Sequence, residues 1–264
     1  MRHTLAGLTL ALTIGACSIS TQQEVEMGTE YARQINAELP IVDDPEVNRY
    51  INVLGDSIAR LADDRSLEWN FYIVNAPEVN AFAVPGGFVY VNRGLVERTQ
   101  NLSQLAGVLG HEIAHVTERH SAEQMEKAQK ANVGLTLACI LTSICQSDAA
   151  AAAIQVGGAA VFASFSRSDE AEADQEAIQN VMRAGIHPAG IPEMFEILIA
   201  ERQRSPGGVE GWFSTHPLEE DRVEATRAAI DAIEPIRLED LVRDTPGFRE
   251  FKRRLQSLPA PRGN

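Results

Sequence analysis

The sequence predicts a mostly helical α+β protein with one small antiparallel sheet, and three observations lead to this prediction. Apolar residues recur every three or four positions on both sides of a short central region. That region, residues 67–91, is instead rich in aromatic and β-branched residues and contains a Pro-Gly-Gly turn. The chain has 264 residues, 44% of them hydrophobic and 23% charged, which is enough for one substantial core.

The N-terminal residues resemble a secretory signal peptide. Residues 1–16 begin with a basic residue, Arg2, and continue with an apolar run too short for a membrane-spanning helix, which needs ~20 residues. The run IGAC that ends at Cys17 resembles a bacterial lipobox. We therefore expect Cys17 to carry lipid, and by the lipoprotein sorting rule the absence of an aspartate after it implies the outer membrane. An ordinary cleaved signal with an incidental cysteine is the alternative.

Two helices are expected next, over residues 21–40 and 44–62. The second has a clear start, because Asp44 suits the N-cap and Pro45 the first helical position. The hydrophobic period then changes, which marks the beginning of the sheet.

Three short strands are expected after these helices, over residues 67–75, 80–84 and 88–91. The Pro-Gly-Gly run at residues 85–87 favours a tight turn between the last two. We therefore expect a small antiparallel sheet of about three strands.

Helical periodicity returns at Ser103. The helix that begins there has apolar residues at spacings of three and four and leaves His111, Glu112 and His115 on a polar face. Further helices are expected over residues 168–185, 191–203 and 216–233.

Two apolar segments, residues 133–145 and 149–165, are short for membrane spans and are interrupted by polar residues or glycine. They are expected to form a buried helical pair or, alternatively, an apolar surface that meets the bilayer or a partner. Cys139 and Cys145 lie in the first segment. A continuous helix would separate their Cα atoms by ~9 Å, beyond the ~7 Å limit of a disulfide. Either the helix breaks and an oxidising compartment favours a bridge, or both are free thiols.

Most of the chain is expected to form one domain, residues 17–240, followed by a partly disordered C-terminal tail, residues 241–264. The net charge of −14 argues against a nucleic-acid partner, because phosphate contacts need a basic surface. The same charge should repel anionic membrane surfaces from the body of the protein.

The residues HEIAH at 111–115 have the pattern of a zinc site. On a helix, His111 and His115 differ by ~40° around the axis and ~6 Å along it, so both rings can point at one ion. Glu112 projects beside them, where it can take a proton from an activated water molecule. For this motif alone, a solvated helix surface is the alternative.

A catalytic zinc ion normally has three protein ligands, so a third must lie elsewhere in the chain. The pattern HExxHxxGxxH fails, because positions 118 and 121 hold Glu118 and Ser121. His120 lies ~140° around the helix from His115 and is expected to face elsewhere. It is therefore a poor candidate for a ligand.

The better candidate lies in DEAEAD, residues 169–174. Glu170 and Asp174 are four apart and share one helix face. Glu170 could ligate the ion, and Asp174 could accept the second ring N–H of a ligating histidine, expected to be His111. Glu172 is expected to point to solvent. An acidic, solvated helix face is the alternative.

These motifs, taken in order, resemble a family of zinc metalloendopeptidases. HEIAH followed by E-x-x-x-D on a later helix is similar to the gluzincins. The runs NAFAVPGGFVYVNRGL, HEIAHVTERH, EAEAD and THP look like the HtpX/BepA-type branch, closest to its small periplasmic lipoproteins. The resemblance implies a zincin-like core with the sheet packed near the HExxH helix. It also implies one Zn²⁺ per chain, held by His111, His115 and Glu170, with Glu112 as general base.

The resemblance further implies an activity and its substrates. It points to a periplasmic endopeptidase, held on the outer membrane by its lipid, that cleaves misfolded or unassembled envelope proteins such as unfolded outer-membrane proteins. Asn80, Ala81 and Phe82 would line the cleft as an exposed strand edge that pairs with an extended substrate. The alternative is a chaperone or assembly factor for outer-membrane proteins with a mainly structural zinc site.

His216, in the run THP, is the last candidate site residue. Pro217 follows it and disfavours helix at residue 216, so His216 is expected on a loop just ahead of a helix. The resemblance implies that this loop reaches the active site. There His216 could stabilise an oxyanion, or it could occupy the fourth position on the zinc and keep the resting enzyme latent. The latch is the favoured role in the resting protein.

Overall fold

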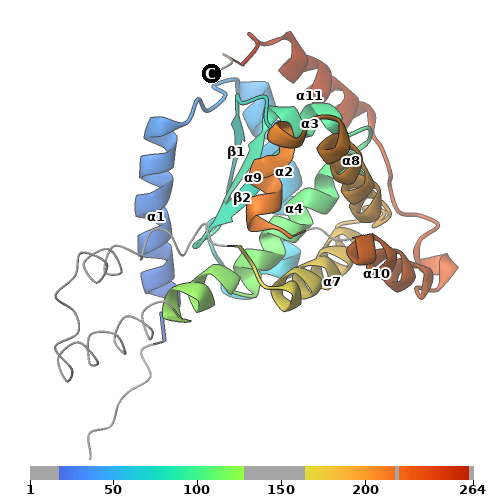
Figure 1. Cartoon of the computed structure of the whole chain (residues 1–264), viewed down its shortest axis with the longest axis horizontal. Helices are drawn as coiled ribbons and strands as arrows, with labels where there is room; N and C mark the ends of the chain where they lie inside the picture. The colour runs from blue at the N-terminus through green and yellow to red at the C-terminus, as the bar shows by residue number, and fades with distance from the viewer. Residues whose placement is uncertain (1–17, 128–163, 218–219, 262–264) are drawn as a thin grey trace, which may run out of the picture.

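The structure, a computed structural model, describes residues 18–127, 164–217 and 220–261. Helices surround a small three-stranded sheet, so the predicted α+β class is confirmed (Figure 1). The expected signal peptide, the lipidated Cys17 and the pair Cys139 and Cys145 lie outside the described residues and stay predictions. The same holds for nearly all of the two apolar segments.

The sheet contains β1 (Asn70–Val74), β2 (Ala81–Val84) and β3 (Phe88–Asn92) in the spatial order β1-β3-β2. β2 and β3 form the expected antiparallel hairpin. The turn between them depends on glycine, since Gly86 and Gly87 have φ angles of 85° and 99°, which other residues rarely adopt.

The pairing of β1 with β3 is parallel, so the prediction of a wholly antiparallel sheet is wrong for this pair. The chain does not turn back after β1. It runs past the end of β3, where Gly94 N–H donates to Ala76 O at 3.0 Å and Asn92 N–H donates to Asn80 O at 2.9 Å. The chain then enters β2 on the far side, which leaves β3 in the centre and β2 at an edge.

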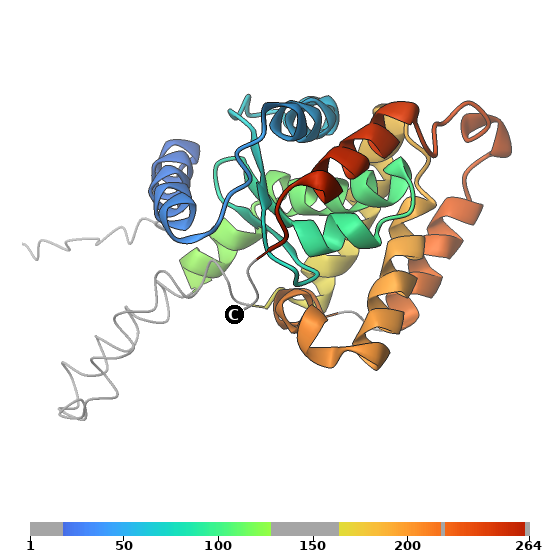
Figure 2. The ribbon, with the colours of Figure 1, turned by 90° about the horizontal axis from the view of Figure 1, so that it is seen from above.

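The two faces of the sheet pack against different helices, as the alternation of side chains along a strand requires. One face joins the main core with α2 (Pro45–Ala62) and α4 (Leu102–Thr117). The other face lies against α1 (Thr21–Glu38), which stands apart from the other helices across the sheet (Figure 2). α1 approaches the hairpin closely, because a Cβ at Gly28 would lie 1.7 Å from the carbonyl oxygen of Pro85.

α4 is the central helix of the protein. The short α3 (Arg93–Arg98) leads into it from β3, and α4 packs against α2, β2, α7 (Arg167–Arg183) and α8 (Gly190–Arg204). Its residues are buried from Leu102 to Val116. Because α4 is enclosed on all sides, the histidines and the glutamate of its HEIAH run are carried into the interior rather than onto a solvated surface.

The chain continues with α9 (Pro206–Thr215), α10 (Glu220–Asp231), a 3-10 helix (Pro235–Arg237) and α11 (Pro246–Ser257). The sequence pattern does not predict α9, because glycine is a poor helix former and the run PGGVEGWFST contains three. None of the helices in the described ranges combines the length and apolar character that crossing a bilayer requires.

Residues 246–257, inside the tail that was expected to be partly disordered, form the helix α11. Three of its apolar side chains are buried in the main core: Phe248, Phe251 and Leu255. The ring of Phe251 stacks on Tyr50 of α2 with 4.5 Å between centroids. Arg254 pairs at 2.7 Å with Asp44, which caps the N-terminus of α2 as predicted. Apolar spacing of three and four, rather than overall charge, decides the state of this segment.

Candidate active site

α4 places His111, Glu112 and His115 in the interior, where each side chain is at most 1% exposed. The solvated-helix alternative for the HEIAH run is therefore wrong. The two histidines lie one turn apart, and their Nε2 atoms are 3.0 Å from each other. Two imidazole nitrogens at this distance share either a proton or a metal ion.

α7 brings Glu170 and Asp174 to the same place. The helix begins at a capping box in which Ser166 and Asp169 exchange hydrogen bonds, so Glu170 lies in the first turn. Glu170 is 0% exposed and Asp174 4% exposed, which excludes the alternative of an acidic, solvated face for these two residues. Glu172, between them in the sequence, has a side chain that is 57% exposed, as predicted.

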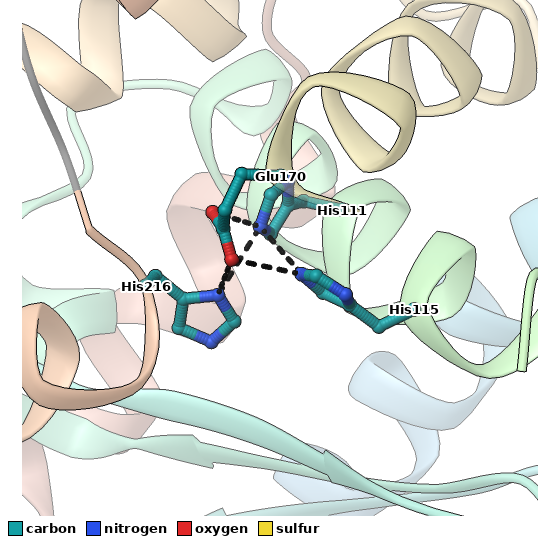
Figure 3. Close-up of side chains that lie close together, drawn as sticks. All are labelled: His111, His115, Glu170 and His216. Carbon is teal, nitrogen blue, oxygen red and sulfur yellow. Dashed lines mark hydrogen bonds and ion pairs between the residues drawn. The ribbon is translucent and has the colours of Figure 1, made fainter. Parts of the chain in front are cut away.

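Four side chains point toward one another at the interface of α4, α7 and the end of α9: His111, His115, Glu170 and His216 (Figure 3). Glu170 Oε2 lies 3.5 Å from His111 Nε2, and Glu170 Oε1 lies 3.5 Å from His115 Nε2. His216 Nδ1 lies 3.0 Å from Glu170 Oε1 and 3.4 Å from His111 Nε2. These separations are close to the edge of about 3.3 Å that bonds of 2.0–2.1 Å give in a tetrahedral zinc site.

The donor set also fits zinc by its chemistry. Three imidazoles and one carboxylate are nitrogen and oxygen ligands of the type that zinc takes, and all four are buried. The sequence predicted three of them as ligands and His216 as a residue that reaches the same point. The structure brings all four together, with one ligand atom of each within 4.8 Å of the others.

Asp174 supports His111 from behind. Its Oδ1 lies 3.0 Å from His111 Nδ1, the ring nitrogen that points away from the cluster, which is the arrangement expected for these two residues. Burial opposes protonation of the His111 ring, but its contacts with Asp174 and Glu170 outweigh burial and raise the pKa of His111 to about 9. The proton on His111 therefore competes with a metal ion at neutral pH.

Arg222 of α10 supplies the counter-charge for the two buried carboxylates. Its Nη1 lies 2.5 Å from Glu170 Oε2, and its Nε and Nη2 donate to the two oxygens of Asp174 at 2.8 and 2.7 Å. Burial alone would raise the pKa of Glu170, but the contacts with His216, His111 and His115 hold it well below its usual range. Burial lowers the pKa of Arg222, but its contacts with Asp174 raise it, and the net effect is a raised pKa.

Glu112 stands beside the four-residue cluster. Burial raises the pKa of Glu112, although nearby His216 and His111 and the backbone N–H of Ala83 act in the opposite direction. Its Oε1 lies 3.5 Å from His216 Nε2. His216 therefore stands between the glutamate and the other three side chains, with one ring nitrogen toward each.

His216 is the C-cap of α9 and lies on a bend before α10, as predicted. Its backbone N–H donates to Trp212 O at 2.9 Å, and its ring packs against Trp212 with 4.8 Å between centroids. Phe165 covers the other side at 5.4 Å, and its N–H donates to Thr215 O at 3.0 Å. The bend is thus fastened through the residues next to His216.

The edge strand β2 contains the predicted substrate-binding residues Ala81 and Phe82, and Asn80 comes immediately before it. In an antiparallel pair the backbone groups point alternately inward and outward. Because Asn80 O accepts from β3, Ala81 and Ala83 direct their backbone groups to the outer edge. This edge is the one that contacts α4.

α9 covers the start of that edge. Val79 N–H, an outward group, donates to Gly208 O of α9 at 2.8 Å. A Cβ at Gly211 of α9 would lie 3.2 Å from the amide nitrogen of Asn80, so the helix is in direct contact with this residue. In this state Asn80 faces α9 rather than an open cleft.

His120 is not where helical spacing places it. Its Nδ1 lies 2.8 Å from His115 Nδ1, so the expectation that it faces elsewhere is wrong. α4 ends at Thr117, and Arg119 has a φ angle of 61°, which redirects the chain before the helix resumes over residues 120–127. The group of described side chains that could share an ion consists of His111, His115, Glu170 and His216.

Sequence reasoning missed two further residues of the site. Arg222 could have been found from charge, since two buried carboxylates require a nearby cation. Phe165, whose ring stacks on His115 with 3.9 Å between centroids and 15° between planes, gave no such signal. It lies at the end of an apolar run, where one aromatic residue is indistinguishable from core.

Comparison with known proteins agrees with this geometry. The model of Peptidase family M48 matches residues 45–230, which include every residue of the cluster. Beta-barrel assembly-enhancing proteases of Yersinia pestis and Escherichia coli (strain K12) are 35% identical to the chain, over 84% and 85% of its length. Metalloendopeptidase OMA1, mitochondrial, of Bos taurus is 30% identical over 60% of the chain and 32% of its own length.

The chain spans about half the length of the assembly-enhancing proteases, since the alignments cover 47% of each. The family match itself extends from α2 to α10 and contains the sheet, the HEIAH helix and the helix of Glu170. The resemblance drawn from the motifs is thereby confirmed at the level of the family. The chain belongs to peptidase family M48, and its buried cluster of three histidines and one glutamate has the composition of a metallopeptidase centre.

Proposed function

We propose that the protein is a zinc-dependent endopeptidase whose active site is the buried cluster on α4, α7 and the end of α9. The observation that carries this proposal is the set of 3.0–3.5 Å separations among ring nitrogens and carboxylate oxygens of four buried side chains. His111, His115 and Glu170 would hold the ion. Asp174 would hold His111 in the tautomer that leaves Nε2 free to ligate.

Zinc bound there would polarise the scissile carbonyl and make water a stronger nucleophile. Glu112 would take a proton from that water and pass it to the leaving amine. Burial raises the pKa of Glu112, which makes the carboxylate a stronger base toward that water. No covalent bond between the chain and its substrate is required.

The state in the structure is proposed to be the latent one. His216 Nδ1 takes a place in the cluster, and His216 Nε2 faces Glu112, so the ring fills the space that a reacting water would need. α9 covers Asn80 at the start of the β2 edge in the same state. Movement of α9 with His216 would open the metal position and the strand edge together.

Substrate would bind in extended form beside β2, through the outward backbone groups of Ala81 and Ala83, with Phe82 on the adjoining face. Such binding is tolerant of sequence and requires an unfolded segment. The relatives' names concern β-barrel assembly, which supports unfolded or unassembled outer-membrane proteins as substrates. A lipid on Cys17 would hold the enzyme on the periplasmic face of the outer membrane, where these proteins are inserted.

Glu112→Gln tests the activity. The variant should bind one zinc per chain with an unchanged circular dichroism spectrum, and cleavage of casein or an unfolded porin should fall by about 10²–10⁴-fold, the contribution of a general base. Glu118→Gln, on the same stretch of chain but outside the cluster, is the matched control. A zinc-loaded Glu112→Gln protein that cuts as fast as the parent would refute the mechanism.

Cys17→Ala tests the anchor separately. The parent should sediment with membranes and be released by detergent, whereas Cys17→Ala should remain in the soluble fraction. Membrane association that is identical in the two proteins would remove the lipid from the proposal and leave the peptidase site untouched.

A role in assembly that does not need cleavage is the second candidate, and the assembly-enhancing relatives are the observation that favours it. Glu112→Gln separates the two in cells. If the variant restores the envelope defect of a deletion strain as well as the parent does, the protein acts mainly as an assembly factor. Failure to restore it would assign the role to proteolysis.

A further inference from the structure

His120 occupies the position behind His115 that Asp174 occupies behind His111. It is 3% exposed, and its Nδ1 lies 2.8 Å from His115 Nδ1, the ring nitrogen directed away from the cluster. Its other nitrogen, Nε2, lies 3.4 Å from Glu172 Oε2. Each of the two α4 histidines therefore has an outer partner, but one partner is a carboxylate and the other is an imidazole.

The backbone places His120 there at a cost. Arg119 has a φ angle of 61°, a backbone conformation that is unfavourable for a residue other than glycine. Its side chain donates to Glu24 Oε2 at 2.9 Å and to Ile19 O at 2.5 Å. Glu24 is 1% exposed and also pairs with Arg65 at 3.1 Å. Ion pairs centred on the buried Glu24 thus hold the turn at Arg119 that returns His120 to the site.

The tautomers along this chain of contacts follow from metal binding. A histidine that ligates through Nε2 must be protonated at Nδ1 when neutral, so His115 Nδ1 is a donor. His120 Nδ1 must then be the acceptor at 2.8 Å, which puts the proton of His120 on Nε2. That N–H is directed at Glu172, a carboxylate whose exposed position allows it to accept. In this series of contacts from His115 to His120 to Glu172, each N–H therefore has one acceptor.

Phe165 fixes the plane of the His115 ring but does not select its tautomer. Its ring stacks on the His115 ring at 3.9 Å and fixes the plane of the imidazole. A stack on the face, however, does not distinguish Nδ1–H from Nε2–H, nor one ring orientation from its 180° flip. Only a hydrogen-bond partner at the edge of the ring makes that choice, and His120 is the partner that the structure provides.

We propose that His120 is a positioning residue of the metal site, which fixes the tautomer and ring orientation of His115 through the hydrogen bond from His115 Nδ1 to His120 Nδ1. The proposal rests on the zinc site of the proposed function. It extends that site to the N-terminal end of the described residues, because Ile19 and Glu24 hold the turn at Arg119.

The first test compares His120→Asn with His120→Leu. The side-chain oxygen of asparagine accepts at about the position of Nδ1, whereas leucine fills the space and accepts nothing. Zinc affinity is measured by competition with a chromophoric chelator. His120→Leu should bind zinc about 10–100-fold more weakly, the usual loss for an outer partner, and His120→Asn should stay within about threefold of the parent. His187→Asn, outside the cluster, is the control.

Two outcomes would overturn the proposal. A folded His120→Leu protein that binds zinc as tightly as the parent would show that His115 needs no edge partner. Equal losses in His120→Asn and His120→Leu would assign the effect to packing instead of to the hydrogen bond. If the parent itself bound no zinc, the proposed function would fail first, so the two failures are distinguishable.

The second test needs no substitution. Nitrogen-15 spectra of the zinc-loaded parent should show His115 and His120 as opposite tautomers, with the proton on Nδ1 of His115 and on Nε2 of His120. The pattern of couplings to ring carbons separates the two forms, and packing alone would not determine it. A His120 protonated on Nδ1 would contradict the proposal even if the leucine variant failed to fold.

Discussion

The two halves of the metal site are built differently. His111, His115 and Glu170 lie on α4 and α7, two long helices packed along each other, and the outward Nδ1 atoms of the histidines each meet a buried partner. His216 lies alone on the bend after α9, which the neighbouring Phe165 and Trp212 hold by single backbone hydrogen bonds. The core therefore places the three proposed ligands of α4 and α7, which form the fixed half, whereas we propose that His216, the removable half, can be withdrawn without disturbing them.

The largest effect should come from removing a ligand of the fixed half. Glu170→Ala should lower zinc affinity by more than about 100-fold, because loss of an outer partner alone costs about 10–100-fold. Gln175→Ala, an exposed residue on the same helix, should bind zinc as the parent does. Zinc content after dialysis measures both. Equal zinc content in Glu170→Ala and the parent would show that the ion does not depend on the ligands of the fixed half.

Arg222 connects the two halves, since it pairs with Glu170 and Asp174 and also donates to Pro217 O at 2.9 Å, next to His216. Arg222→Met should lower the free energy of unfolding of the metal-free protein by about 3 kcal/mol, because two buried carboxylates lose their counter-charge. Arg227→Met, which removes an exposed ion pair with Glu196, should cost less than about 1 kcal/mol. Urea titrations in the presence of a chelator give both values.

The fixed half was the more predictable one from sequence. His111, Glu112 and His115 follow from one run on one helix, and Glu170 and Asp174 from a spacing of four on another, because helix geometry converts spacing into position. His120 could not be placed in this way. A single positive φ at Arg119 interrupts the helix, and the buried pair with Glu24 that stabilises it joins residues 95 positions apart.

The removable half was harder to predict from the sequence. α9 contains three glycines and has no helical signature, so its contact with Asn80 and Val79 is determined by tertiary packing rather than by local preference. For similar reasons the antiparallel pairing predicted for β1 was wrong and α11 was not predicted. The parallel pairing depends on the path of a loop, and the order of the tail depends on three apolar residues in a charged segment.

The pH dependence of zinc binding should also separate the halves. His111 of the fixed half has its pKa raised to about 9 without metal, so below that pH a proton must leave when zinc binds. Zinc affinity should therefore rise up to about tenfold per pH unit between pH 7 and 9, with release of about one proton per zinc at pH 7.5. The metal-free protein should behave oppositely: its stability from this group is complete below the unfolded value of 6.5 and is lost as pH rises through about 9.

Calorimetry in two buffers with different ionisation enthalpies counts the released protons. Asp174→Asn is the informative variant, because it removes the carboxylate that holds the proton on His111 while keeping a side chain of the same shape. On binding zinc at pH 7.5, this variant should release less than half as many protons as the parent does. Unchanged release would place the competing proton elsewhere in the cluster.

The smallest and most discriminating effect is expected for His216. If this residue is a latch, His216→Ala should retain zinc, because the fixed half holds it, and should cleave unfolded casein about 3–10-fold faster than the parent, since a larger fraction of molecules is competent. If it is chiefly an oxyanion donor, turnover should instead fall by about 10²–10³-fold. The geometry favours the latch, because Nδ1 lies among the ligand atoms and Nε2 faces Glu112. His187→Ala controls for the loss of a histidine, and unchanged activity in His216→Ala would remove both roles and with them the proposed division between a fixed and a removable half.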